Sequence, residues 1–437
     1  MRFPAIAGSA YFRSKDARGR LSARLRTIGV RIGRTARDIW LITGITLGLM
    51  LGLEIAYRAQ GAVRHALGRP IAGPAESAPS SILDKTDWWV DYNRDHKTEK
   101  DLKWTSYVYV RNPTFTGTHI IVDSAGHRVT PQPEGVGDRT VEVFFLGGST
   151  TFGWFHRQAF TIPALAAQRL QSVLGPGSRL RVTNFGVPGR IFTQEVIELL
   201  LQLEAGARPD IVVFYDGIND VMATVQNGAA GVPQNEANRV ADFERGRLLE
   251  AESRPGLGNA MHELGHLGWA LVRRSELVTR LGALRTPDPW KPVPTDRLAA
   301  DLTHVYAENV RLTEALAARY GFTVLYVWQP ALMSTGKRLT AREAWLRRPA
   351  DADPEIRPVR DLHVALPPLL RASIPQVVGA RFIDATAVFD ADPLDVFADL
   401  FGHTYERGSP VVLEVMWPQL SGMVGVASRR RSDAGRR

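Results

Sequence analysis

The chain has 437 residues, of which 44% are hydrophobic and 23% charged, and it contains no cysteine. This length permits one large domain with additions or two domains, and the composition excludes a fibrous or wholly disordered protein. The lack of cysteine excludes a disulfide scaffold, a thiol nucleophile and any cysteine-ligated zinc or iron–sulfur site.

The net charge of +9 is concentrated at the two ends of the chain. Residues 1–38 carry a net charge of +8 and the last ten residues carry +4, so the remaining residues sum to −3. A mildly acidic body gives little support to a nucleic-acid-binding face. We therefore expect no nucleic acid among the partners, and we interpret residues 428–437 as a disordered basic tail.

An apolar segment follows the basic leader and ends at Tyr57. It is close to the ~20 residues that cross a bilayer, and Trp40 and Tyr57 fall where interfacial aromatic residues are expected. Because the cationic flank stays in the cytoplasm, we expect a cytoplasmic leader at 1–38, a single transmembrane anchor at 39–57 and an extracytoplasmic, periplasmic remainder. A buried core helix and a cleaved signal peptide are the alternatives.

The part beyond the anchor has the pattern of an α/β domain. Residues 58–82 are rich in Ala, Gly, Pro and Ser and are interpreted as a linker, and residues 83–427 as the main domain. Within that domain, short β-branched apolar runs predict five strands. These runs are Val141–Leu146, Leu180–Phe185, Ile211–Tyr215, Thr323–Trp328 and Arg381–Asp384.

Helical spacing between the strands predicts the fold class. It occurs at Ile162–Leu174, Gln194–Leu203 and Asp296–Tyr320. Strands that alternate with helices imply parallel pairing, and hence a three-layer α/β/α, flavodoxin-like domain with a five-stranded parallel sheet. We expect shorter strands and turns at 83–140, and a helical insertion or cap at 225–295 because this stretch is too long for a simple loop.

Candidate site residues follow the predicted strands, where open parallel sheets bind their ligands. Ser149 comes after a Gly-Gly pair at the end of the first strand, Gly186 follows the second strand and Asn219 the third. Asp399 and His403 come after the fifth strand. A serine hydroxyl is a weak nucleophile until a base removes its proton, and His403 is the candidate base.

Three of these positions suit the stabilisation of an oxyanion. The backbone N–H groups of Ser149 and Gly186, together with the side-chain amide of Asn219, form a predicted three-donor oxyanion hole. Each such donor contributes about 3 kcal/mol in the transition state of acyl transfer.

The order of these motifs resembles that of the SGNH/GDSL hydrolase family. The motifs are Gly-Gly-Ser149-Thr, Gly186, Gly217-x-Asn219-Asp220 and Asp399…His403, spread from about Val141 to Met416. The resemblance implies a serine esterase in which Ser149 is the nucleophile, His403 the base, and Ser149, Gly186 and Asn219 the oxyanion hole. It also implies that no metal or organic cofactor is needed.

The orienting acid departs from the family pattern. The family has Asp three residues before the histidine, where this chain has Leu400. We expect Asp399, four residues before His403, to serve after a one-residue bulge in the loop. Asp395 is a fallback, and a dyad without an acid remains open.

A second motif indicates different chemistry. His262, Glu263 and His266 fit the H-E-x-x-H pattern of zinc peptidases, in which two histidines one helical turn apart hold zinc and the glutamate acts as base. The longer form of that pattern is absent, because Trp269 and Val272 stand where Gly and His are required. We favour a surface helix that packs over the crevice as part of a cap.

The sequence therefore predicts a membrane-anchored, extracytoplasmic serine esterase. We expect it to remove acyl groups, foremost acetyl, from cell-envelope or secreted carbohydrate. An O-acyltransferase that uses the same Ser149 and His403 on polysaccharide, and a non-catalytic polysaccharide export or assembly protein, are alternatives. A zinc peptidase is a minor one.

Overall fold

The computed structural model describes most of the chain beyond the predicted linker. It describes residues 79–98, 102–134, 137, 139–174, 177–240, 242–243 and 293–434, with scattered helical positions between residues 37 and 55. Most of the predicted anchor at 39–57 and of the linker at 58–82 lies outside these residues, as do His262, Glu263 and His266.

The chain divides into two units. One comprises Met1–Ala75 with Leu249–Pro287, and the other Glu76–Leu248 with Asp288–Arg437. The second unit contains every element considered below.

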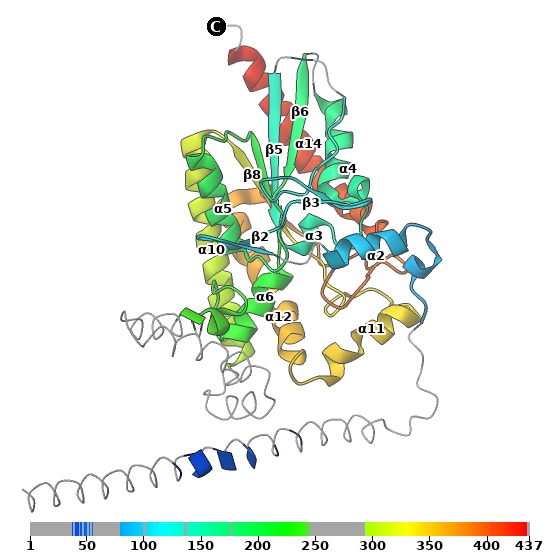
Figure 1. Ribbon diagram of the computed structural model, residues 1–437. Helices are drawn as coiled ribbons and strands as arrows, with labels where there is room; N and C mark the ends of the chain where they lie inside the picture. Colours follow the sequence, from blue (N-terminus) through cyan, green and yellow to red (C-terminus); the bar gives the residue numbers. More distant parts are fainter. Residues whose placement is uncertain are drawn as a thin grey trace, which may run out of the picture. The chain divides into compact units, whose positions relative to one another are not determined.

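A five-stranded parallel sheet forms the centre of this second unit (Figure 1). Its strands lie in the order β6-β5-β7-β8-β9. They are β5 (Arg139–Gly147), β6 (Ser178–Asn184), β7 (Ile211–Asp216), β8 (Thr323–Trp328) and β9 (Phe382–Asp384). Each corresponds to one of the five predicted strands, and the second-first-third-fourth-fifth order is the flavodoxin-like one. The predicted α/β/α fold class is confirmed.

Helices cover both faces of the sheet, as the apolar strands require. On β7, Val212 and Phe214 face one core cluster and Val213 and Tyr215 face the other. The first cluster is completed by α5 (Phe192–Glu204), α6 (Ile218–Asn227), α10 (Thr295–Tyr320) and α12 (Arg357–Ser373). The second is completed by α4 (Ile162–Leu170) and α14 (Gly408–Ala434). Every strand residue of β7 is buried, in agreement with the apolar run Ile211–Tyr215.

Helix α14 is a core helix of the second layer. Among the described residues it is the one helix long and apolar enough to span a membrane by length and composition. Its residues Val412, Met416, Leu420 and Val424 are fully buried or nearly so within the cluster that includes β5, β7 and β8. The helix continues to Ala434, so the prediction of a disordered tail at 428–437 is wrong for the described part of that tail.

Several helices escaped the sequence analysis because proline interrupts their patterns. Pro349 lies inside α11 (Ala341–Ala352), Pro367 and Pro368 inside α12, and Pro418 inside α14. Proline removes a hydrogen bond from a helix interior and is usually a signal for its end. Here the burial of one face of α12 and α14 outweighs that cost.

The segment before the sheet contains a helix as well as the expected short strands. The helix is α2 (Trp89–Thr98), and two antiparallel pairs follow it. The pairs are β1 (Lys103–Thr105) with β2 (Tyr109–Arg111), and β3 (Phe115–Thr116) with β4 (Ile121–Val122). The remaining short elements are η1 (Ile82–Lys85), α3 (Ser149–Phe152), η2 (Gln158–Phe160), η3 (Gln171–Val173), α13 (Pro375–Val378) and η4 (Gly379–Arg381).

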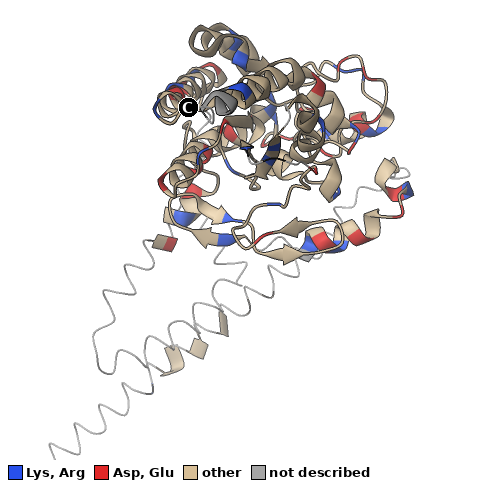
Figure 2. Ribbon diagram, turned by 90° about the horizontal axis from the view of Figure 1, so that it is seen from above, with Lys and Arg blue, Asp and Glu red and all other residues tan. Residues whose placement is uncertain are grey.

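The predicted insertion at 225–295 is described only at its ends. Helix α6 ends at Asn227 and α10 begins at Thr295, and a short helical turn at 236–240 lies between them. Residues 244–292 lie outside the described residues. Over the described elements, basic and acidic residues are interspersed rather than gathered on one face (Figure 2).

Two valines one half-turn apart test the placement of α14. Val424 is fully buried and Val426 is 41% exposed. We expect Val424→Ala to lower the free energy of unfolding by about 2 kcal/mol, because it removes two buried methyl groups and leaves a cavity. Val426→Ala should change it by less than about 0.5 kcal/mol. Urea unfolding followed by circular dichroism measures both, and equal effects would contradict the core position of α14.

Candidate active site

Ser149 lies at the carboxyl end of β5, where the strand turns into the short helix α3. Its side chain is almost fully buried. A Cβ on the preceding Gly148 would lie 2.1 Å from Asn219 Nδ2, so only glycine allows the Asn219 amide to approach this turn. The N–H of Ser149 is at the first position of α3, where helix geometry offers it no intrahelical acceptor.

His403 joins Ser149 to Asp399 through both nitrogens of its ring. The distance from His403 Nε2 to Ser149 Oγ is 2.6 Å, and that from Nδ1 to Asp399 Oδ2 is 2.5 Å. A carboxylate can only accept, so Nδ1 carries the proton of the neutral ring and Nε2 accepts from the Ser149 hydroxyl. This is the tautomer that a general base next to a serine requires.

The loop between β9 and α14 makes the unusual spacing of the acid possible. Asp399 Oδ1 accepts hydrogen bonds from the backbone N–H groups of Phe401, at 2.9 Å, and of His403, at 3.3 Å. The loop is closed behind them by an antiparallel bridge between Phe397 and Thr404. The carboxylate therefore folds back onto the histidine from four residues away. Asp395, the fallback acid, instead accepts from the hydroxyl of Thr340.

Aromatic side chains surround the imidazole on the sides not occupied by its partners. The ring centroids of Trp154 and Phe155 lie 4.9 and 5.7 Å from that of His403. Phe155 has a φ of 65°, a left-handed conformation that a bulky side chain rarely adopts. Its N–H donates to Tyr92 Oη of α2 at 2.6 Å, which fixes this conformation. The sequence analysis missed this contact, which joins segments more than sixty residues apart.

His156 lies near the site but has a different role. Its Nδ1 lies 2.7 Å from the carbonyl oxygen of Trp154 and its Nε2 lies 2.8 Å from Ser409 Oγ. Burial lowers the pKa of His156 to about 4, so the ring is neutral near pH 7. It ties the loop after α3 to the first turn of α14.

The predicted oxyanion hole is only partly as expected. Ser149 and Asn219 are brought together, and Gln234 Nε2 donates to Asn219 Oδ1 at 3.4 Å, which leaves Nδ2 as the free end of the amide. The N–H of Gly186, however, donates to Asn184 Oδ1 at 2.8 Å. A Cβ at Gly186 would lie 2.2 Å from Phe152 N, so this glycine serves a close backbone approach. The prediction that Gly186 is a free oxyanion donor is therefore wrong in this structure.

Three buried carboxyl groups, those of Glu195, Asp216 and Asp220, form a cluster that includes the turn of Asn219. Burial raises the pKa of Asp216 to about 7, and burial together with the neighbouring Asp216 raises the pKa values of Asp220 and Glu195 well above their ordinary range. Asp220 Oδ1 accepts the N–H of Phe192 at 3.0 Å, and Asp216 Oδ2 accepts the hydroxyl of Tyr306 at 3.4 Å. The sequence analysis did not identify this cluster.

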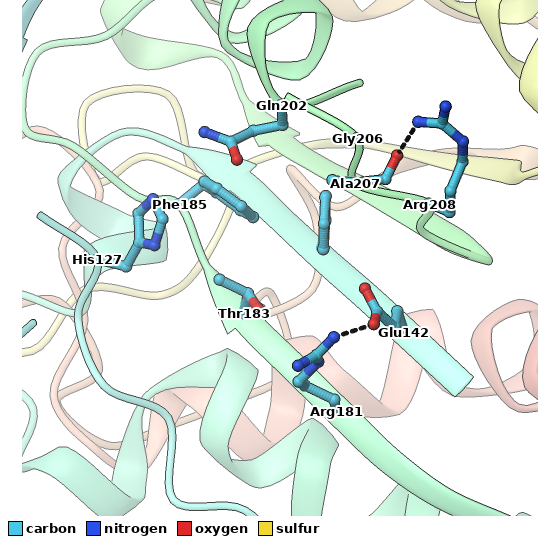
Figure 3. Close-up of a pocket in the computed structure, with 10 residues that line it drawn as sticks. His127, Glu142, Arg181, Thr183, Phe185, Gln202, Gly206, Ala207 and Arg208 are labelled. Atoms are coloured by element: carbon cyan, nitrogen blue, oxygen red, sulfur yellow. Dashed lines mark hydrogen bonds and ion pairs between the residues drawn. The ribbon is translucent and has the colours of Figure 1, made fainter. Parts of the chain in front are cut away.

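Two cavities lie outside the Ser149–His403 contact. One, of about 410 Å³, lies between β5, β6 and the end of α5, where Arg181 pairs with Glu142 and Arg208 bonds the carbonyl of Ala207 (Figure 3). The other, of about 810 Å³, is mainly apolar and is lined by α11 and by the loop at residues 399–401. It reaches the candidate acid, but neither Ser149 nor His403 is part of its lining.

Comparison with known families identifies the domain. Residues 145–364, about half of the chain, match the model of the GDSL-like lipase/acylhydrolase family. The chain belongs to this family. It is accordingly a serine hydrolase that acts on esters, and Asp399 and His403 lie beyond the matched segment.

Solved structures of family members are similar at low sequence identity. A lipolytic G-D-S-L family protein from Veillonella parvula is 12% identical, with 64% of this chain and 97% of that chain covered and a TM-score of 0.33. A carbohydrate acetylesterase family member from Sinorhizobium meliloti is 18% identical (65% and 99% covered, TM-score 0.33). An acetylxylan esterase from Geobacillus stearothermophilus is 15% identical (65% and 95% covered, TM-score 0.31). A search of curated proteins found no match.

The buried carboxyl cluster gives a prediction for the pH dependence of stability. Because the pKa of Asp216 is raised, the folded protein holds a proton that the unfolded chain releases above about pH 4. The free energy of unfolding should therefore fall as the pH rises from about 4 through about 7. Asp216→Asn, which retains an acceptor for Tyr306, should make this fall smaller.

Asp91→Asn is the matched control for that measurement, because the Asp91 side chain is 45% exposed on α2. It should leave the pH dependence of urea unfolding unchanged. A fall with pH that is equally steep in Asp216→Asn and in the unaltered protein would contradict the raised pKa of Asp216.

Proposed function

We propose that the protein is a membrane-anchored serine esterase that removes acyl groups, foremost acetyl, from carbohydrate outside the cytoplasm. The observation that supports the esterase mechanism is the unbroken set of hydrogen bonds from Ser149 through His403 to Asp399. A non-catalytic assembly protein would have no need of a buried serine and imidazole aligned with a carboxylate in this geometry.

The proposed reaction begins with attack of Ser149 Oγ on the ester carbonyl carbon. His403 Nε2 takes the hydroxyl proton, and the Asp399 carboxylate stabilises the imidazolium that forms. When the tetrahedral intermediate collapses, the C–O bond to the alcohol breaks and His403 gives its proton to that oxygen. Water, deprotonated by His403, then hydrolyses the acyl-enzyme and Ser149 regains its proton. These steps use only side chains and water.

The oxyanion formed in both halves of the reaction would be bound by Ser149 N–H and Asn219 Nδ2. We propose the N–H of Gly189 as the third donor in place of Gly186. Gly189 belongs to the same turn after β6, has a φ of 77° and lies against Gln234, which itself bonds Asn219. Within the described part of the chain, the Gly189 N–H donates to no other acceptor.

The proposed location rests on the N-terminal sequence. A basic leader followed by the apolar residues 39–57 favours a cytoplasmic N-terminus with the catalytic domain on the far side of the membrane. Acylated carbohydrate of the cell envelope or of secreted polymers is an ester-bearing material that such a domain would meet there, which is why we propose it as the substrate class.

Replacement of each candidate acid tests the mechanism. We expect Asp399→Asn to lower kcat for p-nitrophenyl acetate by about 10³–10⁴-fold, because the imidazole then loses the group that fixes its tautomer. Asp395→Asn, which alters a carboxylate bonded to Thr340, should stay within a few-fold of the unaltered enzyme. Ser149→Ala should abolish labelling by a fluorophosphonate probe.

The same assay separates hydrolysis from transfer. Continuous release of p-nitrophenol without any sugar acceptor supports the esterase. A burst that stops until a glycan acceptor is added would contradict hydrolysis and indicate an O-acyltransferase. Equal losses in Asp399→Asn and Asp395→Asn would contradict the assignment of the acid.

Reporter fusions test the location. Alkaline phosphatase, which is active only after export, should be active when fused after Ala434, whereas a cytoplasmic fluorescent reporter at the same position should be dark. Deletion of residues 39–57 should reverse both results and release the protein from the membrane fraction. A fluorescent fusion of the unaltered chain would contradict the proposed orientation.

A further inference from the structure

The hairpin of β1 and β2 carries an exposed stack of aromatic rings. The rings of Trp104 and Tyr109 are stacked with centroids 5.4 Å apart and planes 20° apart. The guanidinium of Arg239 lies 4.4 Å from the centroid of Tyr109. Trp104 is 68% exposed although one of its faces is against Tyr109, so its other face is open to solvent. Tyr107, at the turn of the hairpin, is 74% exposed.

Two of the aromatic residues of the hairpin have an unfavourable backbone conformation. Tyr107 and Tyr109 both have a φ of 68°, which bulky L-residues rarely adopt. Two side chains from the turn and helix that follow β6 hold the backbone here. Gln194 Nε2 donates to the carbonyl of Val108, between the two tyrosines, and Arg190 Nη2 donates to that of Val110, directly after them, each at 2.9 Å. Strain that is held in place in this way is typical of functional segments.

A set of side-chain contacts connects the stack to the candidate oxyanion amide. Tyr109 Oη donates to Glu236 Oε1 at 3.4 Å, and Arg239 pairs with Glu236 at 3.1 Å. Arg239 also donates to the carbonyl of Gln234, and the side-chain amide of Gln234 donates to Asn219 Oδ1. Arg239 and Gln234 therefore connect the aromatic stack to the amide that is proposed to bind the oxyanion.

We propose that Trp104, Tyr107 and Tyr109 form a sugar-binding platform for the carbohydrate chain beyond the unit that carries the ester. This inference rests on the proposed function. A pyranose ring has an apolar face of C–H groups that packs on a flat aromatic ring, and hydroxyl groups at its edge that bond to charged groups. The open face of Trp104 and the neighbouring Glu236 and Arg239 supply both kinds of contact.

The platform predicts a difference between polymeric and small substrates. We expect Trp104→Ala in the full-length, detergent-solubilised protein to raise KM for acetylated xylan by about 3–10-fold, the order of one lost ring contact, with kcat unchanged. Trp104→Phe, which keeps a flat ring, should restore most of the affinity. For p-nitrophenyl acetate, which is too small to reach the stack, kcat/KM should stay within two-fold in both variants.

Val90→Ala is the matched control, because Val90 is 69% exposed on α2 away from the hairpin, and it should alter neither substrate. Binding can also be measured without turnover, by isothermal titration calorimetry with unmodified xylan in the Ser149→Ala protein, where adding Trp104→Ala should weaken the binding.

The outcomes separate this inference from the proposed function. An unchanged KM for acetylated xylan in a Trp104→Ala, Tyr107→Ala double variant would overturn the platform while leaving the esterase intact. Equal losses on both substrates, with a lowered melting temperature, would overturn it in favour of a structural role, such as packing by another part of this chain. Absence of activity on p-nitrophenyl acetate in the unaltered protein would instead contradict the proposed function.

Discussion

The site depends on one buried imidazole, both of whose nitrogens need a hydrogen-bond partner at the same time. His403 does so through Ser149, 254 residues earlier in the chain, and through Asp399 in its own loop. The serine comes from the end of β5, and the histidine from the loop that precedes α14, which packs beneath the same sheet. A shift of the loop relative to β5 would leave the buried imidazole without a hydrogen-bond partner, which costs free energy. This cost and the core contacts of α14 together fix the position of the loop relative to β5.

Elements outside the segment matched by the family model complete the site. Helix α2 supplies the Tyr92 hydroxyl that holds Phe155 against His403, and the β1–β2 hairpin is bonded by Arg190 and Gln194 next to the turn after β6. Both precede residue 145, where the match begins. Residues between the predicted linker and the sheet therefore contact the turns that carry the candidate active site.

The strands and most of the candidate site could be predicted from local sequence patterns, whereas features that depend on contacts between distant segments could not. Buried β-branched runs and the turns behind them place all five strands and bring Ser149, Asn219 and His403 to one edge. Helices α12 and α14 were missed because proline hid their periodicity, and the Tyr92–Phe155 contact has no local signal. The error at Gly186 has a local cause that was available: Asn184, two residues earlier, has a side chain that commonly accepts the N–H at this separation.

The buried carboxyl groups of Asp216 and Asp220 lie close to Asn219 in the chain and affect both the stability of the fold and the charge near the candidate site. Asp220 accepts the N–H of Phe192 at the start of α5, and Asp216 is bonded by Tyr306 of α10, so the two acids connect the turn after β7 to two helices. Burial disfavours the charged form of Asp216, which raises its pKa to about 7. While Asp216 is protonated, no full negative charge from this residue opposes the oxyanion proposed to form beside Asn219. The raised pKa values of these buried acids therefore reduce the negative charge close to the amide that is proposed to bind the oxyanion.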